Sequence, residues 1–125
     1  MSVKVDLDQL ADALAEYSFA YLVTVGDDYR AKTIAVSPVL NDGVFDVGPV
    51  GGGTRRNVAA HDNVTLLWPP REPDGYSLIV DGRALASSDD APLQIAPTHA
   101  VLHRPATPNS PPSASGCGDD CLPVG

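Results

Sequence analysis

The residues best suited to chemistry lie between Gly48 and Trp68, where three consecutive glycines precede a threonine and two arginines. Glycine lets the backbone approach an anion closely and adopt positive φ angles. A helix starting after the glycines would add unpaired N–H groups and the positive end of its dipole. Arginine can clamp a phosphate through two parallel hydrogen bonds. The segment therefore predicts a phosphate site with the candidate ligands Gly52, Gly53, Thr54, Arg55 and Arg56.

Two known phosphate motifs do not describe this segment. No Gly-Lys-Ser/Thr follows the glycines, so it is not a P-loop, and the glycines are contiguous rather than spaced as in a dinucleotide fingerprint. The alternative interpretation is a flexible connector followed by solvated arginines.

Lys32 is a second candidate, because it lies in a strand-like segment directly after a turn. Arg30 precedes it by two residues, so both side chains should point to the same face of a strand. The pair would suit an anion, or it could be a solvent-facing pair that keeps an edge strand from aggregating.

The histidines and cysteines give weaker signals. His99 and His103 are four residues apart, which on a strand is about 13 Å, so we expect no shared metal. His61 is expected at a helix end, where it suits the dipole. Cys117 and Cys121 form a C-x3-C pair near the end of the chain. They could form a labile disulfide, bind a metal with further ligands, or belong to a plain exposed tail.

Composition limits the class of protein. The 125 residues fit one domain, and the net charge of −8 argues against general nucleic-acid binding. No apolar run is long enough for a membrane span and no secretory signal is visible, so we expect a cytoplasmic protein without membrane partners. From Pro105 onward Pro, Ser and Gly dominate, which predicts a flexible tail over 105–125 after a domain over 1–104.

A leading helix is predicted over residues 6–16. Asp6 is placed to cap it, and Gln9 stands where a capping-box partner belongs. Apolar residues follow the helical period of 3.6. The expected apolar stripe consists of Leu7, Leu10, Ala11, Leu14 and Ala15.

Short runs of β-branched and aromatic residues between turn signals predict strands. These runs span residues 18–26, 29–40, 44–47, 63–68, 76–87 and 97–103. A short helix is expected over 54–61, Pro38 at a sheet edge or bulge, a hairpin turn at Asn41-Asp42-Gly43 and a bulge or bend at Asp81-Gly82. About six closely spaced strands with hairpin turns predict a mainly β, small antiparallel barrel.

The order of these features resembles the pyridoxamine 5'-phosphate oxidase-like family of flavin-binding split β-barrels. The resemblance covers about residues 5–104 and rests on LVTVGDDYRAKTIAVSPV, NDGVFDVG, Arg-Arg-Asn-Val, HDNVTLLW and VDGRALAS. It implies a six-stranded antiparallel split barrel with two short helices. It also implies a homodimer with two cofactor sites at the interface, and an oxidoreductase that uses FMN or a deazaflavin (coenzyme F-420).

The resemblance also implies further site residues. The cofactor phosphate would lie against the strand that contains Lys32 and Thr33 and against the helix start at Thr54, and Arg56-Asn57 matches the family's Arg-Asn pair. Ser37 could donate to the flavin ring, and Trp68 could wall the ring or a dimer interface, or simply pack in the core. Hydride transfer would need orientation rather than a reactive side chain, so no catalytic residue is expected.

The sequence also departs from the family pattern. Thr54 and Gly52 stand where members often carry basic residues, and the roomier site could suit a longer deazaflavin nucleotide. The C-terminal substrate segment of true pyridoxamine phosphate oxidases is missing, so oxidation of vitamin B6 is not expected. Two alternatives stay open: a non-catalytic carrier of flavin, haem or another tetrapyrrole, with a histidine as axial ligand in the haem case, or a regulatory dimer with a decayed site.

Overall fold

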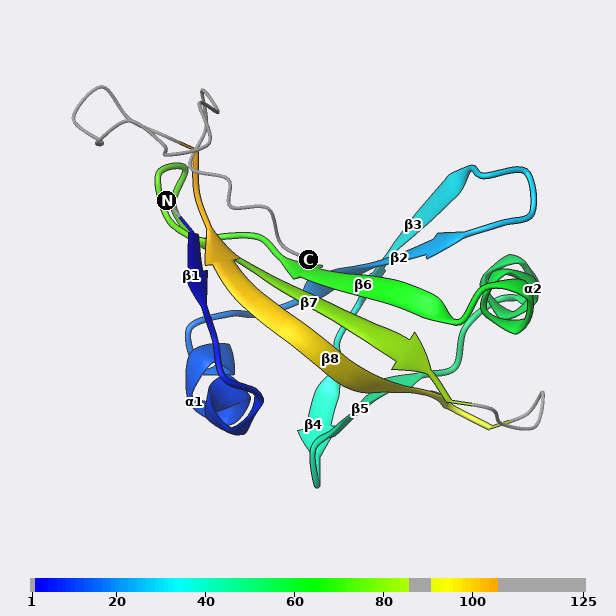
Figure 1. The fold of residues 1–125 in the computed structure, drawn as a ribbon, viewed down its shortest axis with the longest axis horizontal. Coiled ribbons are helices and arrows are strands. Elements are labelled where there is room, and N and C mark those ends of the chain that lie inside the picture. The colour runs from blue at the N-terminus through cyan, green and yellow to red at the C-terminus, as the bar shows by residue number, and fades with distance from the viewer. Residues whose placement is uncertain (1, 86–90, 106–125) are drawn as a thin grey trace.

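Buried and partly exposed side chains alternate along the central strands. In β2 (Ala20–Val25) and β6 (Asn63–Trp68), every second residue is buried, as a half-buried strand requires. The computed structural model describes residues 2–85 and 91–105, which form one antiparallel sheet and two short helices (Figure 1). The other strands are β1 (Ser2–Lys4), β3 (Ala31–Val36), β4 (Val39–Asn41), β5 (Val44–Gly48), β7 (Ser77–Ala84) and β8 (Leu93–His103).

The order of the strands explains the barrel shape. They follow the path β3-β2-β6-β7-β8-β5-β4, with β1 paired to β8. The two ends of this path, β3 and β4, are consecutive in the chain and are joined only through Ser37 and Pro38. The chain thus crosses over the core from one edge of the curved sheet to the other (Figure 1). This arrangement confirms the predicted mainly β split barrel.

The sheet has eight strands rather than the expected six. The predicted strand over 29–40 is divided at Ser37 and Pro38, because proline has no N–H to donate to a ladder. The short β1 was not predicted, and β8 begins at Leu93, four residues before the expected start of the last strand.

The turns are those that the sequence predicts. Asp42 and Gly43 both have positive φ, 51° and 79°, in the hairpin between β4 and β5. The β7–β8 register shifts between Asp81 and Gly82, which confirms the bulge. A Cβ built on Gly82 would lie 2.7 Å from the carbonyl oxygen of Ala96, so glycine is required there.

The leading helix is shorter than predicted. It consists of a 3-10 turn, η1 (Leu7–Gln9), followed by α1 (Leu10–Leu14), and the Asp6 side chain forms no capping hydrogen bond. The cap prediction was therefore wrong. Leu10 is fully buried, whereas Leu7 is exposed, since α1 covers the barrel with only one turn of the expected stripe.

The second helix, α2 (Gly52–Ala60), begins two residues before its predicted start. It lies at the end of the barrel opposite α1, beside the β2–β3 hairpin (Figure 1). Within the described ranges, no helix is long and apolar enough to cross a membrane. The predicted tail over 105–125, with Cys117 and Cys121, lies outside the described residues beyond Pro105.

Candidate functional site

The first turn of α2 presents unpaired backbone donors. The first helical hydrogen bond runs from the Arg55 N–H to the Gly51 carbonyl oxygen at 3.1 Å, so the preceding N–H groups have no acceptor within the helix. Gly51 provides no side-chain cap, and the first turn contains no acidic residue. The positive end of the helix dipole is therefore not neutralised by its own turn.

Lys32 brings an ammonium group to this turn. Its strand runs beside the helix, and a Cβ built on Gly53 would collide with Nζ of Lys32. The missing side chain at Gly53 thus makes room for the ammonium group. Lys32 and Gly53, which were both predicted as phosphate ligands, therefore lie side by side. Arg30 is not part of the group, because it is highly exposed in the turn beside Asp28.

Arg56 adds a second cation. It follows Gly52 by four residues and therefore shares its helix face. A Cβ built on Gly52 would lie 3.5 Å from Arg56 Nη1. Between residues 2–85 and 91–105, neither Arg56 nor Lys32 has a carboxylate within ion-pair distance. The two free positive charges flank the N-terminus of α2.

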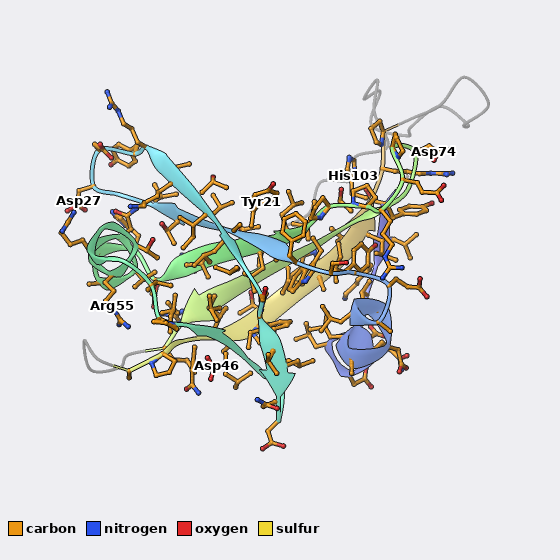
Figure 2. All side chains as sticks on the ribbon, turned by 180° about the vertical axis from the view of Figure 1, so that it is seen from behind. Tyr21, Asp27, Asp46, Arg55, Asp74 and His103 are labelled. Carbon is orange, nitrogen blue, oxygen red and sulfur yellow. The ribbon has the colours of Figure 1, made fainter. Side chains whose placement is uncertain are left out.

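Arg55 points elsewhere. Its Nη2 donates to the carbonyl oxygen of Ala91, just before β8. Figure 2 shows Arg55 on the side of α2 that faces away from Asp27 and the β2–β3 hairpin. Thr54 is only 1% exposed, so it packs against the barrel rather than facing a ligand at the helix start.

Asn57 fastens the helix to the sheet. Its Nδ2 donates to Thr24 Oγ1 at 3.1 Å, and a Cβ on Gly26 would lie 3.0 Å from its Oδ1. Thr24 and Gly26 were not predicted as site residues. The sequence shows Thr24 as a polar residue among apolar neighbours, but it does not show that Asn57 is its partner.

Three other predicted residues lie apart from this group. Thr33 is next to Lys32 in β3 and so projects from the opposite face of the sheet. Ser37 is exposed between β3 and β4. Trp68 is only 3% exposed and packs on Phe45, with ring centroids 5.4 Å apart, which is the core-packing alternative.

The histidines occupy separate places. His61 Nε2 lies 2.9 Å from Asp27 Oδ1, and His103 Nδ1 lies 3.0 Å from Ser2 Oγ. His99 Nε2 is buried and has no hydrogen-bond partner in the described part of the chain. No group of three or more His, Cys, Asp or Glu residues among those described could hold a metal.

The combined arrangement suits an anion with several oxygen atoms. Unpaired N–H groups, an ammonium and a guanidinium surround glycines whose missing side chains leave the backbone accessible. This is the chemistry that binds phosphate at helix N-termini.

Comparison with known proteins gives both close and distant matches. No protein-family model matches the chain. The uncharacterized protein Mb0449c of Mycobacterium bovis is 52% identical over 133 residues, covering 95% of this chain and 94% of that protein. The uncharacterized protein MT0457 of Mycobacterium tuberculosis matches to the same extent.

Solved structures share the fold at low identity. A Listeria innocua protein named as a candidate pyridoxamine 5'-phosphate oxidase has a TM-score of 0.62 and 14% identity, covering 77% of this chain and 96% of that one. A FAD-binding protein from Mesorhizobium loti has a TM-score of 0.63 and 12% identity, with coverages of 82% and 96%. An F420 reductase has a TM-score of 0.52 and 17% identity, with coverages of 77% and 93%. Such identities show the fold alone.

Proposed function

Since this chain belongs to one family with the mycobacterial proteins Mb0449c and MT0457 and has the pyridoxamine 5'-phosphate oxidase-like split-barrel fold, we propose that it binds a flavin-type nucleotide. The names of its structural neighbours refer to FAD binding and to F420 reduction. The proposed activity is an oxidoreductase that transfers a hydride to or from a small organic substrate.

The observation that carries the proposal is the placement of Lys32 Nζ against Gly53. An ammonium group beside the first turn of α2 adds a positive charge to the donors of the helix N-terminus, and together they complement a phosphate in charge. The site fits the nucleotide because its glycines leave the helix N-terminus open. In the proposal Lys32, Arg56 and the N–H groups of Gly52 and Gly53 hold the phosphate.

The protein's residues would bind and orient the cofactor. When bound, a flavin or deazaflavin supplies the hydride chemistry. The charges at α2 would fix one end of the nucleotide. We assign no catalytic side chain. Ser37, which is exposed between β3 and β4, is proposed to contact another part of the nucleotide, whereas Thr33 projects from the opposite face of β3 to Lys32 and is not assigned to the same nucleotide.

We propose further that two copies pair. The outer face of β2 presents partly exposed Tyr21, Val23 and Val25, and the 38%-exposed Phe19 packs edge-on against Tyr21 with centroids 5.3 Å apart. β3 is an edge strand beside this face. Light scattering of the purified protein tests the proposal: twice the chain mass supports it, and the mass of one chain argues against it.

A cofactor titration tests the function. The melting temperature is measured with FMN and with the deazaflavin cofactor in turn. At about 100-fold over its Kd, the true cofactor should add roughly 2.7 kcal/mol of stability. A shift with one cofactor supports the proposal and identifies the cofactor. No shift with either contradicts flavin-nucleotide binding.

A further inference from the structure

We infer that Asn57 is a positioning residue, which holds α2 so that Lys32 and the first turn of the helix meet at a fixed spacing. The Arg56-Asn57 pair invites a direct cofactor contact for both residues, but the structure separates their roles. This inference rests on the proposed function for its effect on cofactor binding, and on contacts within the chain for the positioning itself.

Both ends of the Asn57 amide face the sheet. Nδ2 donates to Thr24 Oγ1 at 3.1 Å, and the acceptor hydroxyl belongs to a residue that is 1% exposed. Oδ1 lies so close to Gly26 that a Cβ there would be 3.0 Å away. An amide engaged in this way points its polar atoms toward β2 rather than toward a ligand at the helix N-terminus.

Two matched pairs connect Asn57 to the phosphate site. Thr24 and Lys32 are directly opposite each other on β2 and β3, so their side chains share a face. Gly53 and Asn57 are four residues apart on α2, so they also share a face. The helix pair therefore faces the strand pair: Asn57 contacts Thr24, and Gly53 contacts Lys32.

A third contact joins the same face of α2 to the β2–β3 hairpin. His61 follows Asn57 by four residues, and its Nε2 lies 2.9 Å from Asp27 Oδ1 in the hairpin turn. Both partners of this contact are substantially exposed, so it stabilises little. Thr54 and Val58 pack α2 against the barrel, and the partly buried Asn57–Thr24 bond is the polar contact that we infer fixes its position relative to the hairpin.

The test replaces Thr24, which cannot touch the cofactor because it is buried. Thr24→Val removes the acceptor and leaves Asn57 intact. We expect the affinity for whichever cofactor the wild type binds to fall about fivefold or more, as the loss of one hydrogen bond implies. Thr24→Ser keeps the hydroxyl and should bind as the wild type does. Thr65→Val is the matched control, since it removes a strand hydroxyl bonded to Asp81, outside the site.

A double-mutant cycle distinguishes positioning from general weakening of the fold. If Thr24 acts through Lys32, then Thr24→Val should cost little further affinity in a Lys32→Ala background. Equal losses in both backgrounds, or no loss from Thr24→Val in the wild-type background, would overturn the inference.

Hydrogen exchange decides the positioning without any cofactor. The amides of Arg55 and His61, which donate within and at the end of α2, should exchange faster in Thr24→Val than in the wild type and in Thr65→Val. Unchanged exchange would overturn the inference. If the wild type bound neither cofactor, the proposed function would fail, while the exchange result would still decide the role of Asn57.

Discussion

Arg55 and Arg56 are neighbours in the chain, yet their side chains contact different parts of the protein. Arg55 Nη2 donates to the Ala91 carbonyl oxygen beside β8, whereas Arg56 Nη1 lies over Gly52 in the first turn of α2. Consecutive residues of a helix point in different directions, and of the two arginines only Arg56 lies beside the first turn in this structure.

The two arginines should therefore respond differently to substitution. Arg56→Ala is expected to weaken cofactor binding about 10- to 100-fold, because charge-assisted bonds to phosphate contribute about 1.5–3 kcal/mol. Arg55→Ala is expected to lower the free energy of unfolding by about 1 kcal/mol and to leave the affinity unchanged. Calorimetric titration and thermal melting measure the two effects. The reverse pattern would show that the wrong arginine was assigned to the phosphate.

Substitutions at Gly53 and Gly52 provide a second comparison of neighbouring positions. A methyl group at Gly53 would collide with Lys32 Nζ, while one at Gly52 would make an ordinary contact with Arg56 at 3.5 Å. Because a lysine side chain can move away, Gly53→Ala should fold with a stability within about 1 kcal/mol of the wild type. It should nevertheless bind the cofactor more weakly than Gly52→Ala does. Equal affinities for the two variants would argue against the position assigned to Lys32.

Tyr29 is held in a costly backbone conformation. Its φ is 61°, and the residue is 87% exposed, so little packing within the described residues compensates for the strain. Tyr29→Gly should raise the free energy of unfolding by up to about 1 kcal/mol. Asp42→Gly is the control, with a φ of 51° but a residue type that tolerates this region, and it should gain less. Chemical denaturation measures both. A less stable Tyr29→Gly would show that the tyrosine ring stabilises the hairpin.

Tyr17 fastens the end of α1 to the barrel, because its hydroxyl donates to the Tyr76 carbonyl oxygen at 2.8 Å. Burial, and secondly the charge of Glu16, raises the pKa of Tyr17 above its usual value. The folded state thus keeps the proton more tightly than the unfolded state. The stability that the protonated Tyr17 hydroxyl contributes is fully present below the unfolded pKa of about 10. It is lost as the pH rises through the folded pKa.

Tyr17→Phe should accordingly cost about 1 kcal/mol of stability at neutral pH. The difference between the wild type and this variant should shrink as the pH is raised above about 10. Denaturation curves of both proteins across this range provide the measurement. A difference that stays constant would mean that Tyr17 has the same pKa in the folded and unfolded states.

Local patterns in the sequence predict most of the sheet. The period of two in 63–68 gives the bounds of β6, and Asn41-Asp42-Gly43 gives the hairpin between β4 and β5, because each signal lies within a few residues. β1 escapes prediction because its three residues have no pattern of their own. They form a strand only by pairing with residues 101–103, about a hundred positions later.

Part of the candidate site is likewise predictable from local sequence, and part depends on long-range contacts. The glycines and arginines before α2 are recognisable as a local anion motif, but the direction of each arginine depends on where the helix starts. Thr24 is a polar residue in an apolar strand, and its partner Asn57 comes 33 residues later. Trp68 could wall a cofactor or fill the core, and only the packing of Phe45 against it distinguishes the two. Long-range contacts therefore carry the information that the sequence pattern lacks.

The phosphate site at the N-terminus of α2 is tested most directly by comparing each cofactor with its own chromophore lacking the phosphate, beginning with FMN and riboflavin. Kd values are measured by calorimetry for the wild type and for Lys32→Ala. We expect the phosphate to strengthen binding to the wild type at least about tenfold, and Lys32→Ala to remove most of this gain. Equal affinity with and without the phosphate would contradict a phosphate site at the N-terminus of α2.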